Sequence, residues 1–276
     1  MDPRTIAGSL AYINWTVLFA LALGSFGVVV LGRLMAGATR GYLAFTSGCA
    51  ALLALLALLT DLSLPAPTGL AIEPAPALDQ LRQALLGAFV VLAAAYTIVL
   101  ARDGRLPALA LAGLLAGVGA AVLAAVGWAG SLVGGVPLAV QFLVLAAATG
   151  GVLAAMILGH WYLVTPRLSE RPLVLVARLL TAVVCFQVVL FVVWAAAGTG
   201  AGGQPFAALL GSSAVFVWLR LTIGLLFPLV VSWMAFRTAS TRSMESATGL
   251  LYIDTAAIAA GTIVAAGLYF AAGLLV

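Results

Sequence analysis

Long apolar runs alternate along the chain with short stretches that hold most of its Pro, Arg and Ser residues. A helix needs about 20 apolar residues to cross the hydrocarbon core of a bilayer, because each residue advances it by ~1.5 Å. No segment alternates apolar and polar residues as a membrane β-strand does. The pattern therefore predicts an all-α integral membrane protein, a bundle of about eight transmembrane helices. The predicted helices cover residues 13–35, 41–64, 83–101, 107–129, 138–164, 173–197, 213–236 and 247–275.

The composition agrees with this fold class. Hydrophobic residues make up 65% of the 276 residues and charged residues 7%, whereas about a quarter of the residues in a soluble domain are charged. Such a chain has too few polar side chains to cover its surface in water, so its first partner is the lipid bilayer. We therefore treat residues 1–276 as a single polytopic membrane domain. The net charge of +4 comes with arginine as the only basic residue type, placed at helix ends, and does not indicate nucleic-acid binding.

The arginines also predict an orientation. The loops after the first, third, fifth and seventh predicted helices are rich in arginine, whereas "GSLVGGVP" and "GTGAGGQP", after the fourth and sixth, carry no charge. Arginine-rich loops stay in the cytoplasm, so both termini are expected outside the cytoplasmic (inner) membrane. Only Arg4, next to Asp2, argues the other way. The loop arginines are Arg33, Arg40, Arg102, Arg105, Arg167, Arg171, Arg237 and Arg242.

The alternation of arginine-rich and uncharged or acidic loops occurs once in each half of the chain. It suggests two four-helix halves, residues 1–130 and 131–276, in parallel orientation. Stripes of small residues within the helices, such as Gly113 with Gly117 and Gly151 with Gly159, predict close helix packing.

One set of ionisable residues falls at a common depth near the predicted cytoplasmic side. His160 lies seven residues before Arg167, and Arg178 lies seven residues after Arg171, which is ~10 Å of helix in each case. Asp254 is about eight residues into the last helix, or ~12 Å. Ionisable groups inside a membrane usually face a partner or water. His160, Arg178 and Asp254 are therefore candidates for one quinone or proton-handling site.

Each of these three residues also has a simpler interpretation. His160 is followed by Trp161 and Tyr162, so it could be a polar member of an interfacial aromatic belt. Arg178 could extend its long side chain to the cytoplasmic surface. The short side chain of Asp254 cannot reach the surface, and its simpler interpretation is an ion pair with Arg178.

A second layer of polar residues lies near the predicted outer face. Asp61 ends the second helix, Gln141 lies near the start of the fifth, and Arg220 lies in the outer part of the seventh. Arg220 could reach the outer headgroups or pair with Asp61. Pro228, about two turns further in, is expected to bend its helix and to release a backbone carbonyl group.

Counts and motifs restrict the chemistry. A bis-histidine haem needs two imidazoles, and the chain has one histidine. Cys49 and Cys185 are far apart in the sequence and do not form a CxxC motif. We therefore interpret them as small buried apolar residues and not as part of a metal or redox site. No HExxH, GxSxG or P-loop motif is present. We therefore expect no haem or metal bound by this chain alone, and quinone is the one cofactor that the inner layer would suit.

Three functional hypotheses remain, and whether the chain is an enzyme stays open. The first is a membrane subunit of a respiratory or redox complex, with a quinone and proton-handling pocket and with its electron carriers on partner subunits. Eight helices with both ends outside are similar, in architecture only, to the membrane anchors of the polysulfide and dimethyl sulfoxide reductase type, although the inner layer would lie on the opposite face from the quinol pocket of that type. The second is a small-solute or proton-coupled transporter. The third is a structural assembly subunit.

Overall fold

The computed structural model describes residues 3–104, 106–165, 168–198 and 203–276. The loop residues Arg105 and Arg167 and the side chain of Arg4, which entered the predicted orientation, lie outside this description. Within the described residues there is no strand, and eight helical spans are long and apolar enough to cross a membrane. The predicted fold class, a multi-pass helical membrane protein, is confirmed.

The helices follow one another along the chain with short connections. The first half of the chain contains α1 (Pro3–Leu31), which continues as the π-helix η1 (Gly32–Ala36), α2 (Arg40–Leu62), η2 (Pro76–Leu78), α3 (Asp79–Ala101) and α4 (Pro107–Ala129). The second half contains α5 (Leu132–Val164), α6 (Arg171–Ala197), η3 (Ala207–Leu209), α7 (Ala214–Leu221), η4 (Thr222–Leu226), α8 (Phe227–Ser240) and α9 (Met244–Ala272). The seventh span consists of α7, the π-helix η4 and α8 together.

Several predicted helix ends differ from the structure, most of all the start of the first helix, which is Pro3 instead of 13. Local chemistry explains two of the differences. α5 begins at Leu132 instead of 138, because the Ser131 side chain accepts a hydrogen bond from the Gly134 backbone N–H (3.1 Å) and caps the earlier start. α9 ends at Ala272 instead of 275, because Gly273 takes the left-handed conformation (φ 67°) and donates its N–H to the Tyr269 carbonyl (2.8 Å).

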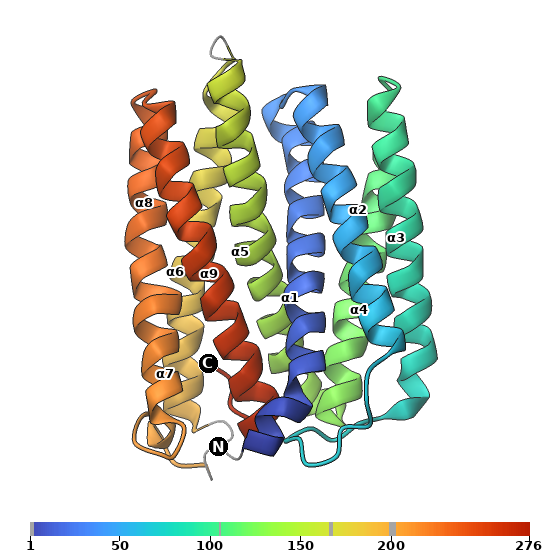
Figure 1. Ribbon diagram of the computed structural model, residues 1–276, viewed down its shortest axis with the longest axis vertical. Helices are drawn as coiled ribbons and strands as arrows, with labels where there is room; N and C mark the ends of the chain where they lie inside the picture. Colours follow the sequence, from blue (N-terminus) through green and yellow to red (C-terminus); the bar gives the residue numbers. More distant parts are fainter. Residues whose placement is uncertain (1–2, 105, 166–167, 199–202) are drawn as a thin grey trace.

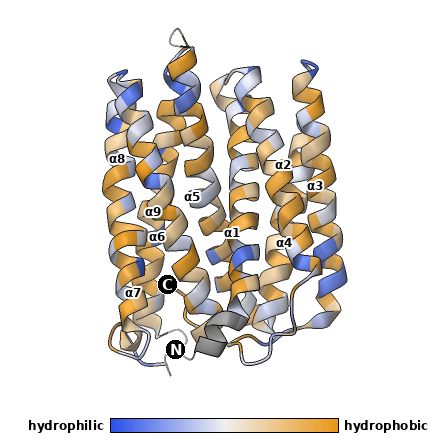
Figure 2. Cartoon of the chain, viewed as in Figure 1, coloured by the Kyte–Doolittle hydropathy of each residue, from blue (hydrophilic) through white to orange (hydrophobic). Residues whose placement is uncertain are grey.

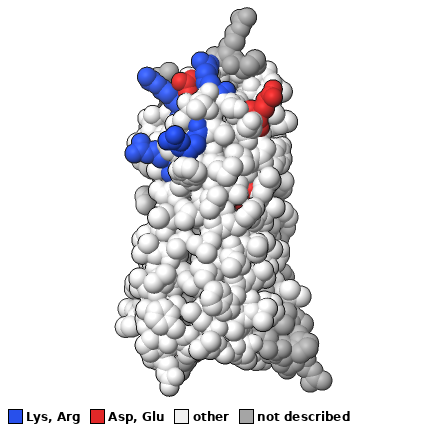
Figure 3. Space-filling model, turned by 90° about the vertical axis from the view of Figure 1, so that its left-hand side faces the viewer, with Lys and Arg blue, Asp and Glu red and all other residues white. Residues whose placement is uncertain are grey.

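The spans stand side by side, and the loops divide between two ends (Figure 1). The connections α1–α2, α3–α4, α5–α6 and α8–α9 lie at one end, which we call the arginine-rich end. The termini and the other connections lie at the opposite end. Figure 2 shows hydrophobic residues along the lengths of the spans, and Figure 3 shows charged side chains gathered near the arginine-rich end of one face. Which side of the membrane this end faces stays a prediction from the arginines.

Helices that are neighbours in sequence pack together within each half. α1 contacts α2, α2 contacts α3, and α3 contacts α4; in the second half α5 contacts α6, α6 contacts α8, α8 contacts α9, and α9 contacts α5. The two groups meet mainly where α1 crosses α5, with further contacts between α4 and α5 and between α1 and α9. An internal repeat of the two groups stays a prediction.

The crossing of α1 and α5 depends on residues without bulky side chains. A Cβ added at Gly24 would overlap the Ala146 carbonyl, and one added at Gly150 would overlap the backbone at Gly24 and Ser25. The Ser25 hydroxyl also donates to the Gly150 carbonyl (3.0 Å). The two backbones therefore touch, as small residues permit in a membrane.

Candidate functional site

The inner layer of predicted site residues does not assemble. Asp254 is fully buried, whereas His160 and Arg178 are exposed on the surface of the bundle. No hydrogen bond or ion pair links these three among the described residues, so the simpler interpretation of Asp254, an ion pair with Arg178, does not hold either. The physical reason is that equal depth fixes the height of a residue on its helix but not the direction in which its side chain points.

The position of His160 follows from its neighbours on α5. A Cβ added at Gly159 would lie 2.7 Å from the Thr248 hydroxyl oxygen of α9, so Gly159 faces the protein. Trp161 packs against α2, where a Cβ added at Gly41 would lie 2.7 Å from its ring. His160, one helical step from each, points away from both contacts and is exposed. This placement favours the aromatic-belt interpretation over a pocket residue.

Asp254 is the buried group that no contact explains. Its side chain has no exposed surface, and neither carboxylate oxygen has a hydrogen-bond partner among the described residues. Ala247, Asp254 and Gly261 are buried at seven-residue intervals and therefore share one face of α9. On this face Gly261 meets the π-helix η4, where a Cβ added at Gly224 would lie 2.7 Å from the Gly261 Cα.

Arg220 of α7 lies beside the same contact and has a structural task. Pro228 has no N–H to give to the carbonyl four residues earlier, which belongs to Gly224. The Arg220 Nη1 donates to that Gly224 oxygen at 3.0 Å. The carbonyl group that Pro228 was expected to release is therefore that of Gly224, in the π-helix. Arg220 donates a hydrogen bond to it. The arginine is buried, and its Nε has no hydrogen-bond partner among the described residues.

The outer layer does not contain the pair that was one of the two interpretations of Arg220. Asp61 does not pair with Arg220. It accepts two hydrogen bonds from Arg82, from Nε at 2.9 Å and from Nη2 at 3.0 Å. Arg82 donates a third to Asp79 at 2.6 Å, and its guanidinium lies 5.2 Å from the centre of the Trp128 ring. Asp61 and Arg82 are both buried, and this cluster holds α2, α3 and α4 together at the opposite end.

Sequence reasoning missed the role of Arg82, although a signal was present. Asp61 lies in the last turn of α2, and Arg82 lies in the first turn of α3. Two helices joined by one loop bring these turns to the same level. Opposite charges placed in this way predict an ion pair between neighbouring helices.

Gln141, the third residue of the outer layer, makes a backbone contact. Its Nε2 donates to the Val276 oxygen at 2.9 Å, and both residues are buried. The amide therefore ties the segment after α9 to α5. Asp61, Gln141 and Arg220 do not form one common site: each has its own partner.

Within the described residues, no three His, Cys, Asp or Glu side chains gather in a way that could hold a metal ion. Cys49 and Cys185 are both free thiols. Among the described residues of the second half, the buried charged residues are Asp254 and Arg220, on either side of the contact between η4 and α9. The eight spans define the class, a helical multi-pass membrane protein. No protein-family model, curated protein or solved structure matches this chain.

Proposed function

We propose that the protein is a proton-coupled transporter of small solutes in which Asp254 binds and releases the proton. The observation that carries this proposal is the buried carboxyl group without a partner. An ionised carboxylate inside a membrane protein costs several kcal/mol unless a partner compensates it. A carboxyl group in such a place is characteristic of proton relays in pumps and transporters.

The seventh span provides the part of the molecule that could move. Because Asp254 is fully buried, a proton reaches it only when packed helices separate. The α-helical pattern is interrupted about two turns of α9 away from it, at the π-helix Thr222–Leu226, and Pro228 follows. Interruptions of this kind concentrate at functional sites. Gly224 and Gly261 bring the two backbones together without interlocking side chains, so the helices can slide or tilt at this point.

Arg220 supplies a charge that senses the state of Asp254. A Cβ added at Gly261 would lie 2.8 Å from the Arg220 Nη1, so the guanidinium lies beside Gly261. Asp254 is seven residues away on the same face of α9, which is ~10 Å along the axis. At this separation the attraction between opposite charges is about 2 kcal/mol at an effective dielectric constant of about 20. Loss of the proton from Asp254 would therefore favour a conformation that brings α7 and α9 closer together.

A membrane subunit of a redox complex is the competing hypothesis. Such a subunit would need donors that converge on the carbonyl oxygens of a quinone. His160, Arg178 and Asp254 were the predicted donors, and they lie apart. The residues do not fit a quinone in this arrangement, and we derive no step of the mechanism through one.

The proposal is tested with the purified chain in liposomes that contain a pH-sensitive dye. Amino acids, sugars, carboxylic acids and organic cations are added in turn under an imposed pH gradient. We expect at least one class to evoke proton movement, and Asp254→Asn to abolish it. Asp103→Asn is the matched control, because Asp103 is an exposed aspartate that pairs with Arg40 at the arginine-rich end. This variant should behave as the wild type.

Two results would contradict the proposal. Solute-evoked proton movement that persists in Asp254→Asn would remove the assigned role of this residue. A lack of response to every solute class, together with co-purification of haem or iron–sulfur subunits from native membranes, would establish the redox hypothesis in its place.

A further inference from the structure

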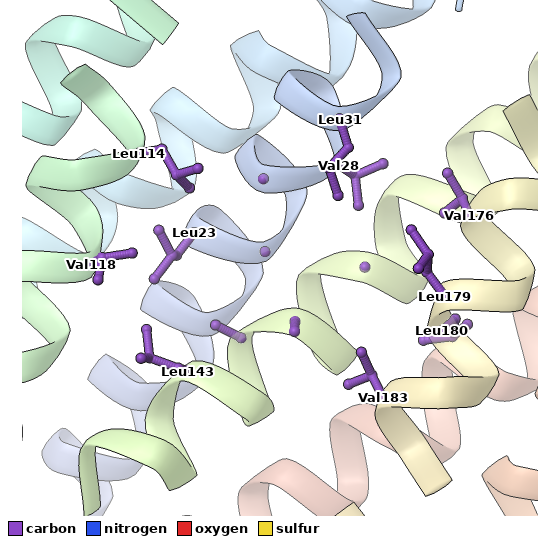
Figure 4. Close-up of a pocket in the computed structure, with 15 residues that line it drawn as sticks. Leu23, Val28, Leu31, Leu114, Val118, Leu143, Val176, Leu179, Leu180 and Val183 are labelled. Atoms are coloured by element: carbon purple, nitrogen blue, oxygen red, sulfur yellow. The ribbon is translucent and has the colours of Figure 1, made fainter. Parts of the chain in front are cut away.

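Two cavities of about 290 Å³ each differ in what they offer to a solute. A groove beside the α1–α5 crossing is lined only by Leu, Val, Ala and Gly residues, so its walls hold no group that could bind a charge (Figure 4). The other cavity is a hollow at the end opposite the arginine-rich end, where η3 and the start of α7 meet the end of α9. Its lining includes the exposed Ser212 and the buried Ser213. Of the two, only the hollow offers hydroxyl groups to a polar solute.

One face of the seventh span leads from this hollow to Arg220. Ser213, Val217 and Arg220 are buried and follow one another at intervals of four and three residues, so they share one face of the helix. The distance from Ser213 to Arg220 along the axis is ~10 Å. Val217 lies between them and belongs to a buried apolar cluster that includes Phe191 and Leu268. Arg220 therefore lies behind one apolar layer, seen from the hollow.

The guanidinium of Arg220 has a donor that no described residue uses. Its Nη1 donates to the Gly224 carbonyl at 3.0 Å, whereas its Nε is buried without a hydrogen-bond partner among the described residues. In a guanidinium, Nε and the second terminal nitrogen form an edge that can bind both oxygens of a carboxylate. The contact with Gly224 uses Nη1 and leaves the Nε edge available to such a ligand.

The charge of Arg220 has no counter-charge in contact. None of the ion pairs between described residues includes it. The second half of the chain contains three acidic residues, Glu170, Glu245 and Asp254. Glu170 and Glu245 lie at the arginine-rich end, and Asp254 lies about two turns of α9 away from the guanidinium. Arginines buried in membrane helices mark the paths of substrates and ions. A bound anion would supply the missing negative charge.

We propose that Arg220 binds the transported solute and that this solute is a small organic monocarboxylate. The proposal rests on the proton-coupled function above and adds the substrate class. One negative charge balances the one charge of Arg220, and the two carboxylate oxygens match the Nε edge. The apolar layer at Val217 and Leu268 favours an aliphatic or aromatic remainder over a sugar, because hydroxyl groups would lose their hydrogen bonds to water on the way.

The two buried charges also provide a reason for the anion and the proton to move together. A proton on Asp254 and a carboxylate on Arg220 neutralise both charges. Without either ligand, the two opposite charges attract each other across the contact between η4 and α9. When only one ligand is bound, one buried charge is left without any compensation, which is unfavourable inside the membrane. Each ligand therefore favours binding of the other.

The binding residue is tested in detergent, apart from transport. The unfolding midpoint of the purified protein is measured against the concentration of acetate, butyrate or benzoate and of the matching neutral amides, because a ligand of the folded state raises this midpoint. We expect at least one carboxylate, and none of the amides, to stabilise the wild type. Arg220→Gln should weaken its affinity at least tenfold. Arg178→Gln removes an exposed arginine of α6 and should bind as the wild type.

Two further variants separate binding from folding and from transport. Pro228→Ala, added to Arg220→Gln, restores a backbone N–H for the Gly224 carbonyl and should recover stability without recovering affinity for the carboxylate. Asp254→Asn replaces the carboxyl group by a neutral one. It should bind the carboxylate at least as tightly as the wild type, because no negative charge remains nearby, while it loses proton movement in liposomes.

Four results in detergent would each overturn the inference. They are retained affinity in the double variant, weaker binding in Asp254→Asn, equal stabilisation by the amides or by sodium chloride, and no stabilisation by any of the three carboxylates. Proton movement evoked in liposomes by a sugar or an organic cation, and lost in Asp254→Asn, would also overturn it and would leave the proton-coupled function standing. Carboxylate binding that depends on Arg220 without proton movement would support the Arg220 site and contradict the proton-coupled function.

Discussion

In the first group of helices the buried carboxylate of Asp61 receives two hydrogen bonds from Arg82, whereas in the second group the buried carboxylate of Asp254 receives none from the described residues. The two arginines differ in the same way. Arg82 contacts two carboxylates and a tryptophan ring, whereas Arg220 meets one backbone carbonyl. Burial alone therefore does not identify a functional charge. The first group uses its charges to hold helices together, whereas the second contains the buried Asp254, without a described partner, on the helix that contacts the interrupted seventh span.

The largest expected effect is on the stability of the first group. Asp61→Asn removes one partner of a buried ion pair, which costs about 3–5 kcal/mol when the other charge remains. We expect a clear decrease in the unfolding midpoint in detergent. Asp61→Asn and Arg82→Gln together should cost less than the sum of the two single changes, because the double variant leaves no unpaired buried charge. Additive costs would mean that the pair does not act as a unit.

A smaller loss of stability is expected from Arg220→Met. This change leaves the Gly224 carbonyl, which Pro228 cannot satisfy, without a donor. A buried acceptor without a partner costs about 1–3 kcal/mol. Pro228→Ala restores a backbone N–H four residues after Gly224 and should recover part of the stability in the Arg220→Met background. If Pro228→Ala gives no recovery, Arg220 does not act through this carbonyl.

Asp254→Asn is expected to change stability by less than about 1 kcal/mol, because no described hydrogen bond is lost and the uncompensated carboxyl group disappears. The same variant should lose the proposed proton coupling. This combination, a stable protein without function, is the reverse of the expectation for Asp61→Asn. A decrease of several kcal/mol in the free energy of unfolding of Asp254→Asn would indicate that Asp254 has a stabilising partner. The two groups of helices would then not differ in this respect.

The smallest effect is expected from His160→Ala. The residue is exposed and forms no hydrogen bond or ion pair with the described residues, so the change should stay within about 0.5 kcal/mol. Thermal unfolding in detergent and the liposome assay would both report wild-type behaviour. Impaired proton movement in this variant would show that His160 belongs to the functional site.

The sequence predicted the fold well because the bilayer imposes a length and a composition that each span must satisfy. It also singled out Asp254, because a short carboxylate deep in an apolar helix cannot reach the surface. The sequence did not predict which residues pair with the buried charged side chains. The direction of a side chain depends on how each helix is rotated against its neighbours, and the separation of His160, Arg178 and Asp254 follows from three such rotations. The task of Arg220 depends on a π-helix, which no residue spacing reveals.

The central claim, that Asp254 is an uncompensated buried carboxyl group and Asp61 a compensated one, has a direct chemical test. Dicyclohexylcarbodiimide enters membranes and reacts with carboxyl groups that hold a proton in apolar surroundings. The protein is treated in liposomes, and the modified residues are located by peptide mass spectrometry. We predict modification at Asp254, its absence in Asp254→Asn, and no modification at Asp61. Modification at Asp61 with Asp254 left unmodified would contradict the account.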